Sequence, residues 1–284
     1  MKTTKLTWNK ILAAAIKRNG WRQLFFYLSN LDIWRFMEYP LVFKYATSGR
    51  KLGKTLDLGA GYSVFPAFFP NEDYTVIDLG KGACKYQQAH GVKAIVHDMT
   101  TLPFENGTMD TIIAISSIEH VPNDIKVFAE IARVLKKDGD AIVTLPHTNG
   151  ITEVRKLKYP AWMEKLLNSH PLLWRKILGE TQLQYFTEQT ETDSIIKYYS
   201  LIDIKQLLSN VGLEIVEQAL IGKQTTRGLF KRIPPGWFVL KDVFIGLPFH
   251  RLERLFLARN TNANGIVLLA RKQRDLNPEH GVYK

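Results

Sequence analysis

The chain has 284 residues, of which 45% are hydrophobic, and its formal net charge is +11 at pH 7. This length and apolar content exclude a disordered polypeptide and suffice for one large α/β domain with insertions. The single cysteine, Cys84, excludes an intramolecular disulfide and a cysteine-based metal site. The sequence also lacks an apolar run near the ~18 residues of a spanning helix and a convincing secretory signal. We therefore expect a cytoplasmic protein.

The positive charge is concentrated in two segments. Residues 1–31 contain six Lys or Arg and no acid, and residues 222–260 contain eight Lys or Arg against two acids. Such segments favour an anionic substrate, an anionic membrane surface or nucleic acid as a partner. A peripheral association with the membrane through these two segments is therefore an alternative to a purely cytoplasmic protein.

The N-terminal segment, residues 1–50, is predicted to form a helical cap. Its first helix has an apolar stripe next to a basic face. The stripe consists of Leu6, Trp8, Ile11, Leu12, Ala15 and Ile16. Two interpretations are open: the stripe packs on the core, or it anchors the chain at a membrane interface.

The next segment, Thr55–Ser63, is the most informative one in the chain. Its sequence TLDLGAGYS is an apolar run that ends in a glycine turn, and the run YTVIDLG at Tyr74–Gly80 ends in Asp78. Two buried strands with this spacing, a glycine turn after the first and an acid after the second, suit a ligand that carries a ribose. Glycine lets the backbone approach the ligand, and the carboxylate can accept hydrogen bonds from both ribose hydroxyls.

The sequence around the turn argues against a dinucleotide. In the pattern G-x-G-x-x-G/A, the sixth position is Val64, which makes a poor pyrophosphate site. Asp57 lies inside the first strand, and its charge would repel a pyrophosphate but attract an ammonium group. The amino-acid part of S-adenosylmethionine carries such a group, so Asp57 is a candidate ligand for it.

Three further runs continue the same pattern. A third strand at 94–96 precedes Asp98 and Met99, which we expect at the adenine amino group and face, with Leu79 flanking the ring. A fourth strand, Asp110–Ile115, ends at Ser116. A helix at 124–135 is broken by Lys-Lys-Asp-Gly at 136–139, and a fifth strand spans 140–145.

The ordered set LDLGAG, VIDLG, HDMTTLPF, SSIEHV and KKDGDAIVTLPH resembles the class I S-adenosylmethionine-dependent methyltransferases. Within that class it resembles the small-molecule branch, type 11, that includes ubiquinone and menaquinone methyltransferases. The resemblance implies a Rossmann-like, seven-stranded, mostly parallel sheet with helices on both faces. It implies that Ser116 contacts the methionine end of the cofactor. Ser63 stands where many members have a third glycine, and we interpret it as a tolerated variant.

The resemblance also organises the chain. The implied cofactor-binding residues are Asp57, Gly59, Ala60, Gly61, Asp78, Leu79, Asp98, Met99 and Ser116. The expected units are a cap at 1–50, a cofactor-binding core at 51–147, a substrate-lid insertion at 148–196, a continuation of the core at 197–221, a basic aromatic insertion at 222–263, and the last strand and tail at 264–284. Within the basic aromatic insertion, residues 250–259 are predicted to form a basic amphipathic helix.

Methyl transfer from a sulfonium needs positioning of the acceptor in line with the leaving sulfur, and it requires no metal. If the acceptor must lose a proton, His120 and His147 are the candidate bases, because both follow strand ends that face the cofactor. Each is also compatible with a purely structural role. We expect a small-molecule or lipid-like acceptor, methylated at oxygen in preference to carbon or nitrogen.

Other functions are weighed against this one. The end of the fourth strand lacks the Asp/Asn-Pro-Pro-aromatic motif of amino-methylating DNA enzymes, and Cys84 is misplaced for a cytosine nucleophile. These observations disfavour nucleic acid as the substrate. An RNA methyltransferase stays open as a less favoured alternative. A non-catalytic, partner-binding subunit with the methyltransferase fold is the other alternative, and Val64 weighs against a nicotinamide-dependent dehydrogenase.

Overall fold

The computed structural model of the chain describes residues 5–20, 33–48, 52–70, 72–148, 151–157, 169–170, 194–221 and 265–273. The elements in chain order are α1 (Trp8–Asn19), α3 (Ile33–Thr47), β1 (Thr55–Leu58), the 3₁₀ turn η2 (Phe65–Phe68), β2 (Tyr74–Asp78), α4 (Lys81–Ala89), β3 (Lys93–Val96), β4 (Met109–Ile115), the 3₁₀ turn η3 (Ile118–His120), α5 (Asp124–Val134), β5 (Leu135–Pro146), β6 (Glu153–Leu157), β7 (Ser194–Tyr198), α9 (Leu201–Asn210), β8 (Leu213–Ile221) and β9 (Gly265–Lys272).

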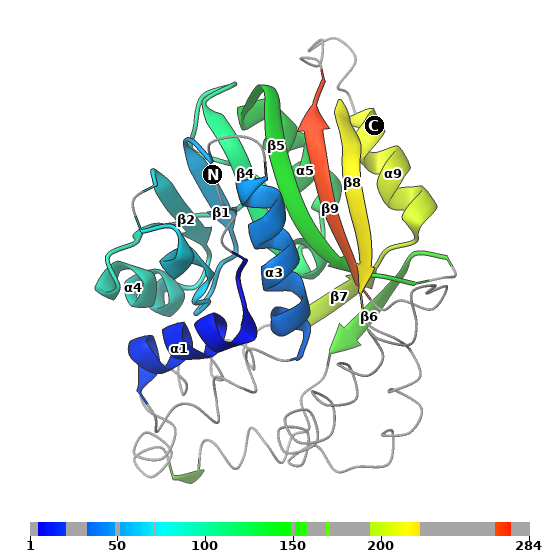
Figure 1. The fold of residues 1–284 in the computed structure, drawn as a ribbon. Coiled ribbons are helices and arrows are strands. Elements are labelled where there is room, and N and C mark those ends of the chain that lie inside the picture. The colour runs from blue at the N-terminus through cyan, green and yellow to red at the C-terminus, as the bar shows by residue number, and fades with distance from the viewer. Residues whose placement is uncertain are drawn as a thin grey trace.

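Seven strands form one sheet in the order β3-β2-β1-β4-β5-β9-β8 (Figure 1). The five strands from β3 to β5 are parallel, and β9 runs antiparallel to both of its neighbours, β5 and β8. The prediction of a seven-stranded, mostly parallel Rossmann-like sheet is therefore confirmed. β8 lies in the segment expected to continue the core, 197–221, and β9 is the last strand expected within 264–284.

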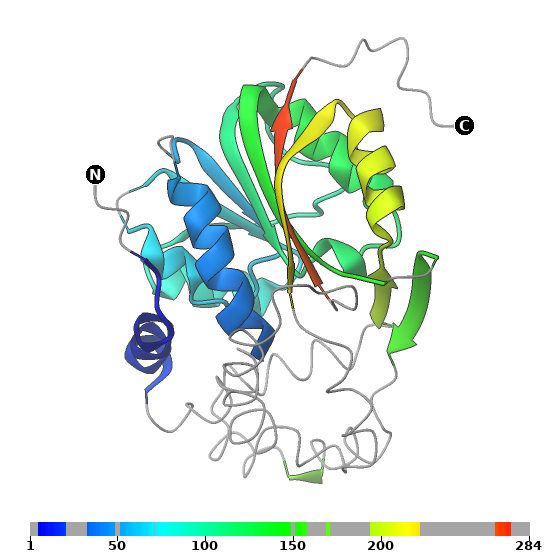
Figure 2. The same cartoon turned by 45° about the vertical axis from the view of Figure 1, so that its right-hand side comes forward.

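The two faces of the sheet bury separate apolar clusters. Alternating residues of one strand point to opposite faces, so Ile113 packs on the face covered by α1, α3 and α4, and Ile112 packs on the face covered by α5 and α9. Figure 2 shows α3 crossing one face while α5 and α9 lie against the other. Both faces are covered, which explains why β1, β4 and the end of β5 read as nearly continuous apolar runs.

The start of β5 differs from the prediction. The Lys-Lys-Asp-Gly segment at 136–139 was expected to separate a helix from a strand, but β5 already begins at Leu135. Pairing with β4 keeps this segment in the sheet: Met109 pairs with Leu135 and Thr111 pairs with Asp140, with a register shift between the two pairs. The extra residues form a bulge, and Asp138 takes a left-handed φ of +62°.

A two-stranded antiparallel sheet, β6–β7, lies beside the large sheet, and neither of its strands was predicted. Its strands are the two ends of the segment expected to be a substrate-lid insertion, so they form a stem for it. His147, just after β5, forms a parallel bridge with Tyr199, just after β7. The rest of the segment, 158–168 and 171–193, lies outside the described residues.

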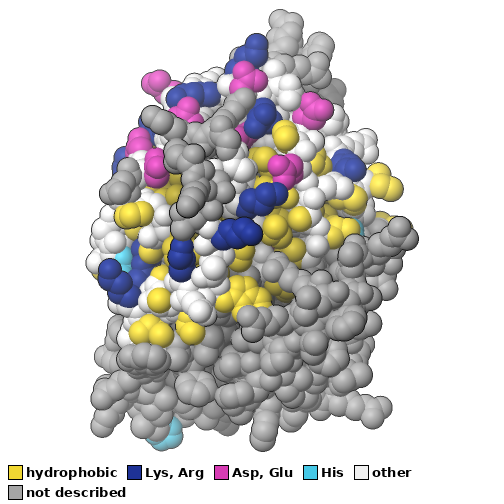
Figure 3. All heavy atoms as spheres, viewed as in Figure 1, with side chains coloured by type: hydrophobic (Ala, Val, Ile, Leu, Met, Phe, Trp, Pro, Cys, Tyr) yellow, Lys and Arg dark blue, Asp and Glu magenta, His cyan; other side chains and the backbone are white. Residues whose placement is uncertain are grey.

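The first helix of the cap packs on the core through its apolar stripe: Ile11 and Ala15 are buried against the cluster under α3. Lys44 on α3 also pairs with Glu217 on β8 at 3.2 Å, and this face of the molecule shows Lys and Arg side chains among apolar ones (Figure 3). Across the described ranges, the structure holds no helix long and apolar enough to cross a membrane. The basic aromatic insertion and its predicted helix at 250–259 lie outside these ranges.

Candidate cofactor and active site

The site lies where the course of the chain along the sheet reverses. β1 pairs in parallel with β2 on one side and with β4 on the other, and the chain visits β2 and β3 before it returns to β4. Ligands of open α/β sheets bind in the crevice outside the carboxyl ends of the strands at such a reversal. The topology therefore brings Gly59, Gly61, Asp78 and Ser116 to one edge of the sheet.

The glycine turn after β1 is packed at its first glycine and open at its second. Gly59 and Gly61 have left-handed φ angles of +71° and +54°, which glycine adopts at little steric cost. A Cβ on Gly59 would lie 2.6 Å from Cβ of Ser117 and 3.2 Å from Cε of Met99. A Cβ on Gly61 would meet no atom of the described chain within 4 Å. At Gly61, next to the partly exposed Ala60, the backbone thus borders space that no described residue fills.

Asp78, the last residue of β2, faces this turn. One carboxylate oxygen accepts a hydrogen bond from the Gly61 N–H at 2.9 Å, and the other accepts one from the Gly80 N–H at 2.8 Å. Burial raises the pKa of Asp78 above its usual value, and the two N–H donors only partly offset that rise. Each carboxylate oxygen has two lone pairs, so the oriented carboxylate retains acceptor capacity for hydroxyl donors.

Asp57 lies in the interior of β1 and is 1% exposed. One of its oxygens accepts a hydrogen bond from the hydroxyl of Tyr74 at 2.6 Å. Burial raises the pKa of the Tyr74 hydroxyl well above its usual range, and the charge of Asp57 raises it further. The structure therefore places Asp57 beneath the turn, within the sheet, and pairs it with a neutral phenol.

The residues expected at an adenine follow β2 and β3. Leu79 is 68% exposed directly after Asp78, so an apolar side chain borders the crevice. Asp98 is exposed and accepts a hydrogen bond from the Thr100 N–H at 2.8 Å. Met99 reaches the glycine turn, as its distance from Gly59 shows. These residues thus follow the carboxyl ends of β2 and β3.

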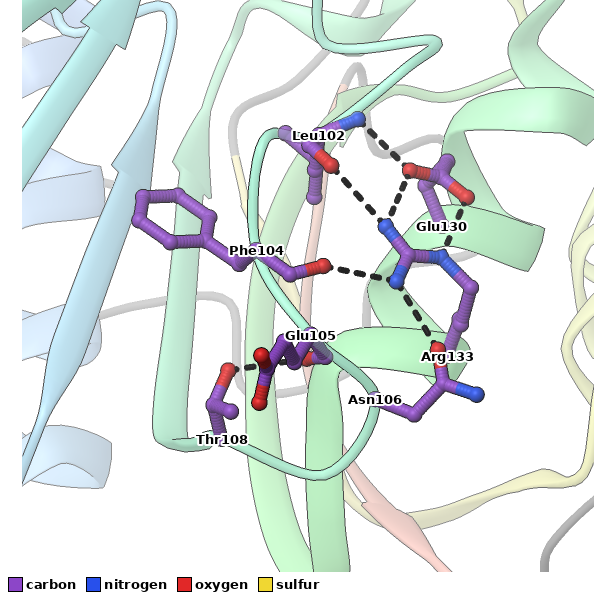
Figure 4. Close-up of polar contacts among 7 residues, drawn as sticks. All are labelled: Leu102, Phe104, Glu105, Asn106, Thr108, Glu130 and Arg133. Atoms are coloured by element: carbon purple, nitrogen blue, oxygen red, sulfur yellow. Dashed lines mark hydrogen bonds and ion pairs between the residues drawn. The ribbon is translucent and has the colours of Figure 1, made fainter.

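The loop that carries Asp98 and Met99 is fixed by Arg133 on α5 (Figure 4). The guanidinium donates two hydrogen bonds to the Glu130 carboxylate, at 2.7 and 2.8 Å, and others to the carbonyls of Phe104 and Leu102. Burial alone would raise the pKa of Glu130, but the hydrogen bonds from Arg133 and from the Leu102 N–H lower it overall. A bidentate pair of this kind holds a loop in one geometry.

Ser116 follows β4 and has a left-handed φ of +46°, which is costly for a residue with a side chain. Its hydroxyl donates to a carboxylate oxygen of Glu38 at 2.7 Å, and the Thr144 hydroxyl donates to the same oxygen at 3.0 Å. Glu38 belongs to α3 and is 4% exposed. The sequence analysis missed this acid, although it is the one acid in the apolar segment Ile33–Thr47.

Ser63 connects the glycine turn to the N-terminal cap. Its hydroxyl lies 2.8 Å from the hydroxyl of Tyr39 on α3 and accepts a hydrogen bond from the Phe65 N–H at 3.0 Å. A glycine at this position could form neither contact. The residue interpreted as a tolerated variant thus has a structural role of its own.

Gln87 on α4 holds the same turn from the other side and is fully buried. Its amide donates to the carbonyls of Gly61 and Ser63, at 2.9 Å each, and accepts from Arg18 of α1 at 3.1 Å. Arg18 also donates to the Ser63 carbonyl at 3.1 Å. Helix α4 of the core and helix α1 of the cap therefore fix the backbone of the turn together, and the sequence contained no motif that would have revealed this.

The two candidate bases differ in their surroundings. His147 is 6% exposed, and its Nδ1 lies 3.1 Å from the carbonyl oxygen of Tyr199. Because a carbonyl only accepts, Nδ1 carries the hydrogen, and the lone pair of the neutral ring is on Nε2. His120 ends η3 and is exposed. The hydrogen bond to Tyr199 thus defines the tautomer of His147.

The neighbourhood of His147 is stabilised by a buried carboxylate. Asp124, at the start of α5, accepts hydrogen bonds from the Tyr199 hydroxyl at 2.9 Å and from the Lys197 ammonium at 2.7 Å. Burial and then the charge of Asp124 raise the pKa of the Tyr199 hydroxyl far above its usual range. These bonds fasten the end of the β6–β7 stem to the segment after β4.

Part of the chain is similar in sequence to known proteins. Residues 56–143 match the family described as methyltransferase domain. The chain is 27% identical over 198 residues to a bifunctional biotin-biosynthesis protein of Saccharophagus degradans, covering 61% of this chain and 34% of that protein. It is 41% identical over 68 residues to a sterol 4-C-methyltransferase of Caenorhabditis elegans, covering 24% and 20% of the respective lengths. The chain therefore spans about a third or less of the length of these two relatives.

A solved structure resembles the chain over most of its length. It is the 1,6-didemethyltoxoflavin N1-methyltransferase of Burkholderia thailandensis, with 1,6-didemethyltoxoflavin and S-adenosylhomocysteine bound. The TM-score is 0.50, the identity is 14%, and the comparison covers 92% of this chain and 89% of the other. At this identity the likeness concerns the fold.

Proposed function

We propose that this chain, which carries a class I methyltransferase domain, is an S-adenosylmethionine-dependent methyltransferase with a small-molecule or lipid-like acceptor. One observation carries the proposal: the glycine turn has open space at Gly61 and, at the same point, orients the carboxylate of Asp78 by a 2.9 Å hydrogen bond. The open backbone and the acceptor capacity of Asp78 fit a ribose with two hydroxyl donors.

The remaining cofactor residues follow from that placement. With the ribose at Asp78, the exposed Leu79 and the loop with Asp98 and Met99 would hold the adenine on the β3 side. The methionine part would extend across the glycine turn toward Ser116. Asp57 stays a predicted partner of the ammonium group, with its carboxylate beneath the turn.

The chemistry supplied by the bound cofactor is an electrophilic methyl group on a sulfonium. The contribution of the chain is to hold an acceptor atom in line with that group, roughly 3 Å away, and to exclude water. His147 is the favoured base, because the hydrogen bond of its Nδ1 to the Tyr199 carbonyl places the lone pair of the neutral ring on Nε2. His120 is the second candidate.

The proposal for the acceptor comes from two similar methyltransferases and from the position of His147. The names of the sterol and didemethyltoxoflavin methyltransferases refer to small organic acceptors. We propose oxygen as the methylated atom, since His147 would assist an alcohol, phenol or acid. The acceptor would approach on the side of the β6–β7 stem, which the His147–Tyr199 bridge joins to the site.

Calorimetric titration with S-adenosylhomocysteine tests the cofactor. We expect the wild-type chain to bind it and Asp78→Ala to bind at least about tenfold more weakly, because a charge-assisted hydrogen-bond pair is lost. Absence of wild-type binding would contradict the proposal and favour the non-catalytic subunit. A mutant that binds as well as the wild type would contradict the role of Asp78.

A labelled-methyl assay tests the reaction. The wild-type chain is incubated with labelled cofactor and fractionated extract of the native cell, and the product is identified by mass spectrometry. Label in small organic or lipid products supports the proposal, whereas label in RNA alone refutes it in favour of the RNA alternative.

Membrane association is tested separately with vesicles. We propose that residues 222–260 draw the chain to an anionic surface, because α1 of the other basic segment already uses Ile11 and Ala15 for packing. Co-sedimentation with anionic but not neutral vesicles is expected at low salt. Equal recovery in the supernatant with both would exclude this association.

A further inference from the structure

An acid from the N-terminal cap contacts the chain where it leaves β4. Glu38 on α3 is buried, and one of its carboxylate oxygens accepts hydrogen bonds from the hydroxyls of Ser116 and Thr144, at 2.7 and 3.0 Å. We propose that Glu38 is a positioning residue for the cofactor site: its hydrogen bonds keep Ser116 in the strained conformation that places Ser117 against the glycine turn. This inference rests on the proposed function and adds a residue outside the matched segment 56–143.

The backbone of Ser116 has a conformation that a side chain disfavours. Its φ of +46° is in the left-handed region, which Ser116 shares only with Asp138 among the non-glycine residues that the structure describes. For an L-residue the cost of this region biases a conformational equilibrium roughly five- to thirtyfold against it. Such a conformation persists only where the surroundings impose it. Contacts of Ser116 must therefore offset the strain.

These contacts come from α3 and β5. The Ser116 N–H donates to the Thr144 hydroxyl at 2.9 Å, and that hydroxyl donates to Glu38. The bond from the Ser116 hydroxyl to the same carboxylate oxygen closes a cycle of three hydrogen bonds. Glu38 and Thr144 are both buried, in a region where α3 packs against the sheet. The role of Glu38 needs an acceptor oxygen at this position and does not depend on the net charge of the surroundings.

The kink at Ser116 determines where the next residue lies. Ser117 is buried, and its hydroxyl donates to the carbonyl of Leu58, the last residue of β1, at 2.7 Å. A Cβ on Gly59 would lie 2.6 Å from Cβ of Ser117, so Ser117 packs directly on the glycine turn. With an ordinary φ at Ser116 the chain would leave β4 in another direction, and Ser117 would lose both contacts. The shape of the turn that we propose for the ribose thus depends on Ser116.

Two substitutions of Ser116 separate its conformation from its hydrogen bond. Ser116→Ala and Ser116→Gly both remove the hydroxyl that donates to Glu38, but only alanine keeps the penalty for a left-handed φ. In calorimetry with S-adenosylhomocysteine, we expect the dissociation constant of Ser116→Ala to be about fivefold or more above that of Ser116→Gly, because apparent affinity falls with the population of the competent conformation. Equal dissociation constants would overturn the inference.

Substitutions of Glu38 connect this effect to the cap. Glu38→Leu removes the acceptor, and we expect the dissociation constant to rise about fivefold or more in the wild-type background. In the Ser116→Gly background, where little strain needs to be offset, the same substitution should raise it less than about twofold. Glu38→Gln keeps an acceptor oxygen, so it should weaken binding less than Glu38→Leu. An equal loss from Glu38→Leu in both backgrounds would show that Glu38 does not act through Ser116, and would overturn the inference.

Asp138 supplies the matched control. It has a left-handed φ of +62° in the bulge at the start of β5, at the opposite edge of the sheet from Ser116. Asp138→Ala and Asp138→Gly should bind S-adenosylhomocysteine equally well, because the strain at Asp138 is remote from the proposed site. A difference as large as that between the two Ser116 variants would trace the effect to general destabilisation and overturn the inference.

The outcomes separate this inference from the proposed function. A folded wild-type chain that fails to bind S-adenosylhomocysteine refutes the proposed function, and the inference with it. Wild-type binding without a difference between the Ser116 variants leaves the proposed function intact and overturns the inference alone. If Glu38→Leu does not fold, the two Ser116 variants decide the question.

Discussion

The two glycines of the turn give the sharpest test of the site, because the same substitution should act mainly on ligand binding at one position and mainly on stability at the other, two residues away. At Gly61 an added Cβ meets nothing within 4 Å in the described chain, whereas at Gly59 it lies 2.6 Å from Cβ of Ser117. Gly61→Ala should therefore fill ligand space without crowding the protein. Gly59→Ala should crowd the protein itself.

The magnitudes follow from the backbone and the contacts. Both glycines have left-handed φ, so alanine costs about 1–2 kcal/mol at either position. At Gly59 the overlap adds roughly 1–3 kcal/mol, because Ser117 is held by its hydrogen bond to the Leu58 carbonyl at 2.7 Å. We expect Gly61→Ala to lower Tm by a few degrees and Gly59→Ala to lower it two- to threefold more, on the order of ten degrees.

Gly107 supplies the matched control. It has a left-handed φ of +63°, and an added Cβ there meets no atom of the described residues within 4 Å. Gly107 lies before β4, however, at the opposite edge of the sheet from Ser116. Gly107→Ala should thus match the strain of Gly61→Ala and leave binding unchanged. Thermal unfolding and calorimetry with S-adenosylhomocysteine measure both effects. Wild-type affinity in Gly61→Ala, with the expected small loss of stability, would refute the placement of the cofactor over the turn.

Three further predictions concern the groups that support the site. Gln87→Leu should lower both the free energy of unfolding, by about 2 kcal/mol, and the affinity for S-adenosylhomocysteine, because the Gly61 and Ser63 carbonyls of the turn lose the hydrogen bonds from the Gln87 amide. Unchanged affinity in a folded variant would contradict this. Arg133 lowers the pKa of Glu130, so their interaction stabilises the protein above about pH 4.5 and this contribution disappears as the pH falls. Arg133→Met should therefore be less stable than the wild type at pH 7 and should lose less stability below about pH 4.5. Denaturant titrations at about pH 3.5–7 measure this, and parallel stability curves for the two proteins would argue against it. Affinity for S-adenosylhomocysteine should fall as the pH drops through the raised pKa of Asp78, above 3.8, since protonation removes the carboxylate acceptor; the same pH profile in a folded Asp78→Asn variant would assign the dependence to another group.

The first strands of the core and the position of Asp78 at the end of β2 were predictable because local signals determine them. The strands β1, β2 and β4 are short, largely apolar runs that lead into Gly59, Asp78 and Ser116, and burial on both faces favours such runs. The bulge in β5 was not predictable, because the pairing of Met109 and Thr111 on β4 decides where the Lys-Lys-Asp-Gly segment lies. A break in a sequence pattern does not reveal whether the neighbouring strand continues alongside it.

Glu38 was missed for a related reason. Its hydroxyl partners, Ser116 and Thr144, are 78 and 106 residues away in the sequence, and a lone acid in an apolar helix has no local pattern that indicates a partner. Asp57 shows the converse case. Its place before a glycine turn suggests contact with a ligand, but only the fold reveals that it is bonded to Tyr74 within the sheet.

The contacts of Ser63 explain how the cap and the glycine turn depend on each other. A third glycine would leave the turn connected to α3 by packing alone, whereas the Ser63 hydroxyl joins Tyr39 to the Phe65 N–H. Arg18 of α1 adds a hydrogen bond to the Ser63 carbonyl. The turn that would hold the ribose is thus fixed by α1 and α3, which both lie outside the matched segment. Linkage is reciprocal, so the free energy by which the docked cap strengthens ligand binding equals the free energy by which the ligand stabilises cap docking. The serine therefore couples the N-terminal helices thermodynamically to the cofactor site.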